Sequence, residues 1–102
     1  MPPVTLLFSP YQVRKLHLKN RIVVSPMTQF SCVDGVPGDW HLVHLGRFAL
    51  GGAGLVFVEQ AAVQEVGRVT YGCLGLWNSQ QVAPLARLAQ FIKENGAAVA
   101  LQ

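Results

Sequence analysis

An unbroken run of β-branched residues near the start of the chain ends abruptly at a proline. Residues 21–24 read Arg-Ile-Val-Val, a composition typical of a strand that is buried on both faces of a sheet. Pro26 cannot donate to a sheet ladder and favours extended geometry in Ser25, so the strand should stop there. Met27 and Thr28 follow at its end. This stretch is either a ligand site at the carboxyl edge of a parallel sheet or a simple strand-ending turn.

Two more strands are expected further along the chain. Residues 55–58 (Leu-Val-Phe-Val) form a second continuous apolar run, and residues 97–101 form a third. Glu59 and Gln60 directly follow the second run, so the arrangement of the first strand is repeated. Glu59 is therefore either paired in the interior or exposed at the rim of the sheet.

Two helices are expected between these strands. Asp39 is a good N-cap for a helix over residues 40–50, which carries two apolar stripes and ends at a glycine pair. Asn78 or Ser79 is expected to cap the second helix, which should stop at Asn95-Gly96.

Strand, helix, strand, helix and strand in this order predict an α/β fold, a right-handed βαβαβ unit with a parallel sheet. The first and third strands would each leave an apolar ladder edge open, which natural domains avoid. We therefore expect residues 1–102 to be the opening segment of a larger α/β domain.

The segments outside this unit are predicted to be short strands or loops. Residues 1–20 hold two apolar patches around Ser9-Pro10, the pattern of a small hairpin or meander ahead of the main sheet. Residues 63–77 are punctuated by three glycines and are expected to form a long loop over the carboxyl face of the sheet.

Composition excludes several classes of protein. The chain is 51% apolar and only 13% charged, and its net charge of +3 comes from scattered basic residues. A nucleic-acid interface is therefore not expected. The most apolar window, residues 48–58, is too short to span a bilayer, and no signal peptide is evident. Cys32 and Cys73 form neither a metal motif nor a disulfide framework, which suits a reducing cytoplasm.

Two histidines lie on the first expected helix. His41 and His44 are separated by three residues, a spacing that can hold a metal ion. No third ligand is evident near them in the sequence, so hydrogen-bonding roles are favoured and no metal is assigned.

Four ordered segments of the chain resemble a known family. They are residues 18–27 (LKNRIVVSPM), 54–59 (GLVFVE), Gly67-Arg68 with residues 74–77 (LGLW), and 99–102 (VALQ). Together they resemble the Old Yellow Enzyme family of FMN-dependent ene-reductases, most closely its YqjM-like subgroup. The resemblance implies part of a TIM (β/α)8 barrel: strands one to three, helices one and two, and a hairpin over residues 1–20 that closes the barrel bottom.

The resemblance also implies a set of flavin contacts at the strand ends. Ser25, Pro26, Met27 and Thr28 match residues that line the FMN in the family. The backbone of Gln60 and the amide of Gln102 match groups that approach the flavin ring.

Three positions depart from the subgroup's pattern. Thr28 stands where the subgroup usually has cysteine. Phe30 replaces a tyrosine that touches substrate, and Gln60 replaces a residue that is usually small.

The function implied is that of an oxidoreductase which takes hydride from NADPH or NADH onto FMN and reduces an activated C=C bond of an enone-type substrate. The catalytic residues and the phosphate-binding segments of the family would lie beyond Gln102. The segment alone is therefore expected to be inactive and to need the missing barrel segment, and the complete protein is a candidate homo-oligomer. The alternative is a non-catalytic α/β module, or half of a split barrel that pairs with another chain.

Overall fold

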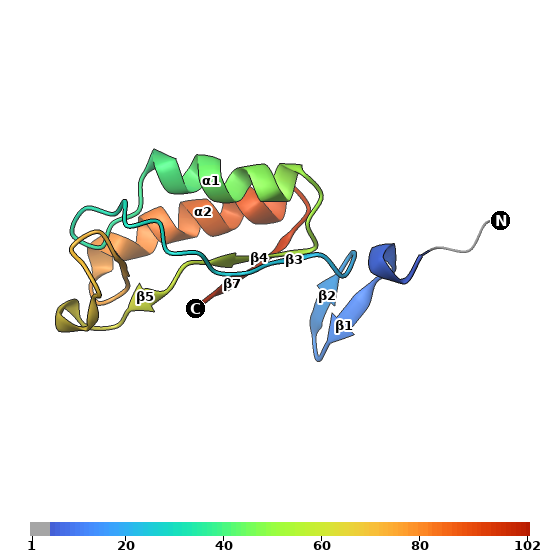
Figure 1. Cartoon of the computed structure of the whole chain (residues 1–102), viewed down its shortest axis with the longest axis horizontal. Coiled ribbons are helices and arrows are strands. Elements are labelled where there is room, and N and C mark those ends of the chain that lie inside the picture. The colour runs from blue at the N-terminus through green and yellow to red at the C-terminus, as the bar shows by residue number, and fades with distance from the viewer. Residues whose placement is uncertain (1–4) are drawn as a thin grey trace.

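Two helices cover one face of a small parallel sheet. The computed structural model describes residues 5–102, and Figure 1 shows α1 and α2 side by side above the strands. The order in the sheet is β3-β4-β7, with β4 in the centre and all pairs parallel. The elements of this unit are β3 (Val23–Val24), α1 (Asp39–Leu50), β4 (Leu55–Val58), α2 (Val82–Glu94) and β7 (Ala98–Leu101). The predicted βαβαβ unit is confirmed.

A separate hairpin precedes the sheet. A single 3-10 turn, η1 (Leu6–Phe8), leads into the antiparallel strands β1 (Tyr11–Val13) and β2 (Leu16–Leu18). Figure 1 shows this hairpin at the end of the molecule opposite the loop after β5. The predicted hairpin is confirmed from residue 5 onward, and residues 1–4 of the expected segment lie outside the described residues. Closure of a barrel bottom by this hairpin stays a prediction.

The first strand is shorter and more exposed than predicted. β3 holds two residues instead of the four expected over 21–24, and the Val23 side chain is 48% exposed. Backbone pairing nevertheless begins earlier, since the carbonyl of Ile22 accepts from the N–H groups of Gly54 and Leu55. Burial on both faces was the wrong expectation because the helices cover only one face of the sheet: Val24 packs against the core, whereas Val23 lies on the other face.

Helix α1 begins one residue earlier than predicted. Gly38 is the N-cap and Asp39 is the first helical residue, so the expected cap at Asp39 is wrong. The helix starts at Gly38 because its carbonyl accepts from the N–H groups of His41 and Leu42, while its own N–H donates to Nδ1 of His41 at 3.2 Å. The glycine pair ends the helix as predicted, with Gly52 at φ +102°.

Only one of the two apolar stripes of α1 is buried. Leu45 and Ala49 pack into the core, whereas Trp40, Val43 and Leu50 are each at least 60% exposed. Helix α2 covers the buried side, and Gly46 allows the close approach, because a Cβ atom there would lie 2.6 Å from the ring of Phe91.

Helix α2 is preceded by a 3-10 turn, η3 (Ser79–Gln81), which Asn78 caps by accepting from the N–H of Gln80 at 3.0 Å. Leu88 and Ile92 then carry the helix into the core, and Gly96 at φ +91° ends it as predicted.

The long loop after β4 holds more order than the sequence indicated. Its ends pair as a short parallel ladder, β5 (Ala61–Ala62) with β6 (Leu74–Gly75), and a 3-10 turn, η2 (Glu65–Gly67), lies between them. Leu74 is fully buried in the core beneath this loop. The ladder anchors the loop at the carboxyl ends of the strands.

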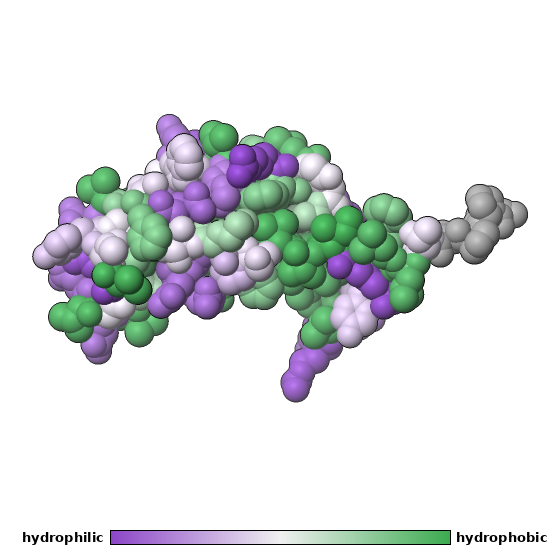
Figure 2. Space-filling model, viewed as in Figure 1, coloured by the Kyte–Doolittle hydropathy of each residue, from purple (hydrophilic) through white to green (hydrophobic). Residues whose placement is uncertain are grey.

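The sheet's two edges remain apolar and open, as predicted. Figure 2 shows a broad hydrophobic area over the strands on the face in view, beside the hairpin. A hollow of about 160 Å³ next to β7 is lined by α2 and by residues such as Val58, Val99 and Leu101. Among residues 5–102, no helix is long and apolar enough to cross a membrane.

Candidate functional site at the carboxyl ends of the strands

The carboxyl ends of the three parallel strands meet at one edge of the sheet. Val58, the last residue of β4, pairs with Leu101 of β7. Gln60 and Gln102 therefore lie on neighbouring segments just beyond these two strands. The N–H of Ala61 donates to the carbonyl of Gln102 at 3.0 Å and ties these two ends together. Both glutamine side chains are exposed at this edge.

A small hollow brings three of the predicted site residues together. Thr28, Phe30 and Gln60 line a space of about 40 Å³, which residues of the 63–77 loop close from the other side. Phe30 is 55% exposed, and Thr28 is half-buried. The strand-ending stretch thus faces the end of another strand across a small hollow, and its role as a ligand site stays a prediction.

The other predicted residues lie near this hollow but do not line it. Ser25 and Met27 are exposed, and Pro26 is half-buried. Gln102 lies at the same edge, where its carbonyl accepts from the N–H of Ala61. A hydroxyl and two carboxamides are thus open at one edge, and such groups fit the carbonyl acceptors and the N–H of a flavin's pyrimidine side.

Gln29 organises the bend that carries Thr28 and Phe30. Its side-chain Nε2 donates to the carbonyl of Met27 at 3.0 Å, and its Oε1 accepts from the indole N–H of Trp40 at 3.0 Å. Its own N–H donates to Oε2 of Glu59 at 2.6 Å. Phe30 adopts φ +54°, a region that a bulky residue seldom occupies, so these contacts hold a disfavoured backbone.

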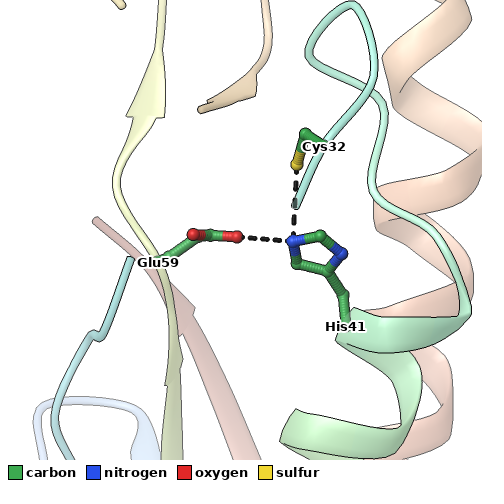
Figure 3. Close-up of side chains that lie close together, drawn as sticks. All are labelled: Cys32, His41 and Glu59. Carbon is green, nitrogen blue, oxygen red and sulfur yellow. Dashed lines mark hydrogen bonds and ion pairs between the residues drawn. The ribbon is translucent and has the colours of Figure 1, made fainter. Parts of the chain in front are cut away.

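Beneath this bend lies a buried cluster of three side chains, Cys32, His41 and Glu59 (Figure 3). Each is at most 6% exposed. The Nε2 atom of His41 lies 2.7 Å from Oε1 of Glu59 and 3.4 Å from Sγ of Cys32. Glu59 is therefore paired in the interior, the first of the two alternatives that the sequence left open.

The histidine tautomer follows from its second nitrogen. Nδ1 of His41 accepts from the N–H of Gly38, so the proton of the neutral ring lies on Nε2. The N–H on Nε2 thus faces Oε1 of Glu59, 2.7 Å away, with Sγ of Cys32 at 3.4 Å.

The cluster does not have the geometry of a metal centre. Its ligand atoms lie within 4.8 Å of one another. Two ligands about 2.0 Å from a tetrahedral metal would be about 3.3 Å apart, well beyond the 2.7 Å between Nε2 of His41 and Oε1 of Glu59. The geometry supports the hydrogen-bonding roles expected for the helix histidines.

Burial also shifts the pKa values of two side chains, Cys32 and His44. Burial, together with the charge of Glu59 and the neighbouring Cys73, raises the pKa of the Cys32 thiol to about 12. Burial and the adjacent Arg47 guanidinium lower the pKa of His44. Nδ1 of His44 accepts from Nη2 of Arg47 at 3.2 Å. Cys32 is thus a protonated, unreactive thiol at neutral pH.

Three residues contribute to the site in ways that the sequence did not predict: Gln29, Trp40 as its partner, and Arg68. Arg68 lines the hollow, and its guanidinium lies 5.2 Å from the ring centres of Tyr71 and Trp77. A Gly-Arg pair in an otherwise irregular loop was the only local signal for Arg68. Gln29 had none, since its role depends on a carboxylate thirty residues away.

A family model matches residues 6–102, nearly the whole chain: the NADH:flavin oxidoreductase / NADH oxidase family, whose flavin is FMN. The cofactors expected from the sequence, FMN with NADPH or NADH, agree with this family. They also agree with a solved structure of morphinone reductase in complex with tetrahydroNAD, 28% identical with a TM-score of 0.86 over 97% of this chain and 27% of that chain.

Curated relatives are similar over almost all of the chain. A protein named NADPH dehydrogenase from Geobacillus sp. (strain WCH70) is 44% identical over 100 residues, covering 96% of this chain. Another from Listeria monocytogenes serotype 4a (strain HCC23) is 47% identical over 98 residues, covering 94%. In both cases the chain spans 29% of the relative's own length.

Solved structures agree in fold. Morphinone reductase superposes with a TM-score of 0.86 at 30% identity, over 94% of this chain and 25% of that chain. Old Yellow Enzyme from Pichia sp. AKU4542 gives 0.88 at 25% identity, over 96% and 26%. The fold is thus part of a (β/α)8 barrel, and the resemblance to Old Yellow Enzyme is confirmed. Because the family model matches residues 6–102, this chain belongs to the NADH:flavin oxidoreductase / NADH oxidase family.

Proposed function

We propose that this chain is the amino-terminal segment of an FMN-dependent oxidoreductase that uses NADPH or NADH to reduce activated C=C bonds, such as those of enones. The observation that carries the proposal is the meeting of Thr28, Phe30 and Gln60 around one hollow at the carboxyl edge of the sheet. In a (β/α)8 barrel this edge carries the active site.

The residues that would hold FMN are Ser25, Pro26, Met27, Thr28, Gln60 and Gln102. When bound, FMN would supply the hydride chemistry. The Thr28 hydroxyl can donate to an acceptor on the flavin edge, and the Gln102 carboxamide can both donate and accept. The Thr28 donor would stabilise the reduced, anionic flavin ring and so raise the midpoint potential of the flavin.

Phe30 is proposed to contact the substrate. Its ring is 55% exposed on the rim of the hollow, and it has no hydroxyl to offer. It can therefore supply an apolar wall but no proton. Groups that hold a substrate carbonyl or the FMN phosphate are proposed to come from the part of the barrel that the relatives have and this segment does not.

A second proposal follows from the open sheet edges: the segment forms half of a barrel that is completed by another chain. Val23 on β3 and Leu101 on β7 are 48% and 43% exposed, so both ladder edges are free to accept a further strand. On this view the chain alone is inactive, and FMN binding appears only with the complementary segment.

The experiment uses a chimera, termed the completed barrel, in which this chain replaces the aligned segment of the Geobacillus NADPH dehydrogenase. We expect the chimera to bind FMN and to oxidise NADPH with an enone as acceptor. Visible absorbance and NADPH consumption are the measurements. Co-expression of the two segments as separate chains tests the split-barrel version. A completed barrel that folds but stays colourless would contradict the proposal.

A further inference from the structure

We propose that Glu59 is a positioning residue that fixes the flavin-facing bend at Thr28–Phe30 through the backbone of Gln29. This inference rests on the proposed function, since the bend matters only if it faces a flavin. It assigns a role to a buried carboxylate that none of the proposed flavin contacts explains.

The bond between the two residues is short and internal. Oε2 of Glu59 accepts from the N–H of Gln29 at 2.6 Å, and Glu59 is 2% exposed. A carboxylate acceptor makes a stronger bond than a neutral oxygen, and the exclusion of water strengthens it further. The N–H belongs to the peptide that joins Thr28 to Gln29. Fixing its direction therefore fixes the backbone from which the Thr28 side chain projects.

Glu59 is itself held in place from helix α1. Its Oε1 lies 2.7 Å from Nε2 of His41, and the other nitrogen of that ring accepts from the N–H of Gly38 at the helix start. Figure 3 shows the carboxylate and the ring pointing toward each other, the first from the chain just after β4 and the second from α1. The bend is thus connected through two buried side chains to a helix terminus.

The bend needs such support because its backbone is disfavoured. Phe30 lies at φ +54°, and its backbone is in close contact with Gly72: a Cβ atom at Gly72 would be 2.4 Å from the Phe30 carbonyl oxygen. Without the acceptor on Glu59, the partly buried Gln29 N–H would lose its partner, and the bend would relax toward ordinary geometry.

The test is a double-mutant cycle in the completed barrel, with the FMN midpoint potential as the readout. Glu59→Leu should move the potential in the same direction as Thr28→Ala, because both remove the Thr28 donor from its place. The double variant should show little more than one single effect, since the two changes act on the same contact. Glu59→Gln keeps an oxygen for Gln29 and should give a smaller shift than Glu59→Leu. If the Glu59→Leu protein does not accumulate, Glu59→Gln takes its place in the double-mutant cycle with Thr28→Ala.

Gln81→Leu is the matched control. Gln81 is also fully buried and also holds backbone N–H groups, those of Trp77 and Asn78, but it does not touch the bend. It should lower the melting temperature and leave the potential unchanged.

The outcomes separate the two proposals. A shift for Thr28→Ala with none for either Glu59 variant would overturn the positioning role and leave the proposed function standing. FMN bound with no shift for Thr28→Ala would overturn the Thr28 contact and the positioning role that depends on it. An unmutated completed barrel that folds without FMN would contradict the proposed function, and the positioning role with it.

Discussion

The N–H of Ala61 donates to the carbonyl of Gln102 at 3.0 Å, three residues beyond the last paired residue of β4 and one residue beyond that of β7. This bond continues the parallel ladder past the ends of both strands. It holds the Gln102 backbone against the chain that carries Gln60, and so places two exposed carboxamides at the edge where Thr28 and Phe30 also lie. The first prediction concerns this edge.

Gln102→Leu in the completed barrel should weaken FMN binding by roughly 1–3 kcal/mol, because ring N–H and C=O groups would lose their partner. Fluorescence titration of FMN into the apoprotein measures the change. Gln80→Leu, at an exposed position before α2, is the control and should leave the affinity unchanged. Equal affinities for both variants would mean that Gln102 faces away from the flavin.

Thr28→Ala should lower the flavin potential by about 30 mV, since one hydrogen bond to the reduced ring is lost and 30 mV corresponds to about 1.4 kcal/mol for two electrons. Thr28→Ser keeps the hydroxyl and should stay near the unmutated value. Potentiometric titration of the three proteins decides this. Equal midpoint potentials for all three proteins would mean that the Thr28 hydroxyl does not contact the flavin.

Gly72→Ala should destabilise the completed barrel by about 1–3 kcal/mol, because the new Cβ atom would meet the backbone of Phe30 rather than a movable side chain. Its KM for the enone should rise as Phe30 is displaced. Gly67→Ala is the control for stability, since a Cβ atom there meets only Ala62 at 3.9 Å. Thermal melts and steady-state kinetics of both variants test the pair, and similar behaviour of the two would argue against the close contact.

Cys32 should make stability fall in alkaline solution. Its pKa is raised to about 12 from an ordinary value of 9.0, so the folded state retains the proton more strongly than the unfolded state. The associated stability is complete below pH 9 and is lost as pH rises toward 12, by about 1.4 kcal/mol per unit. Denaturant unfolding of the completed barrel between pH 8 and 10.5 should show this decline relative to Cys32→Ala, which lacks the thiol. Parallel pH profiles for the two proteins would contradict it.

The chain alone should be colourless, should reduce no enone, and should aggregate or fold only loosely. Its sheet has two open edges, and few flavin contacts must offset the cost of ordering the ligand. The visible spectrum, size-exclusion profile and thermal melt of the purified 102-residue chain are the measurements. A yellow, monodisperse protein with a cooperative melt would contradict this prediction.

Local chemistry was enough to predict most of the elements. The apolar run Leu55–Val58, the glycine stops at Gly51 and Gly96, and the cap at Asn78 act through neighbouring residues, so their effects are visible in sequence. The edge at which the site would lie was predictable for the same reason, because polar residues directly follow each strand.

Which apolar residues are buried was harder to predict than which residues form strands and helices. The run at 21–24 has the composition of a buried strand, yet Val23 is half-exposed, because the composition of a strand does not say whether both faces of the sheet are covered. The apolar stripe of Trp40, Val43 and Leu50 is exposed for the same reason: one helix covers α1 on one side only.

The sequence by itself determined that polar groups gather at three strand ends. Only the tertiary structure decided which of them meet. Glu59 lies thirty residues from Gln29 and eighteen from His41, and no local pattern relates these positions. Their contacts exist because the end of β4 brings Glu59 next to both the bend and α1, and because a carboxylate excluded from water needs an N–H partner.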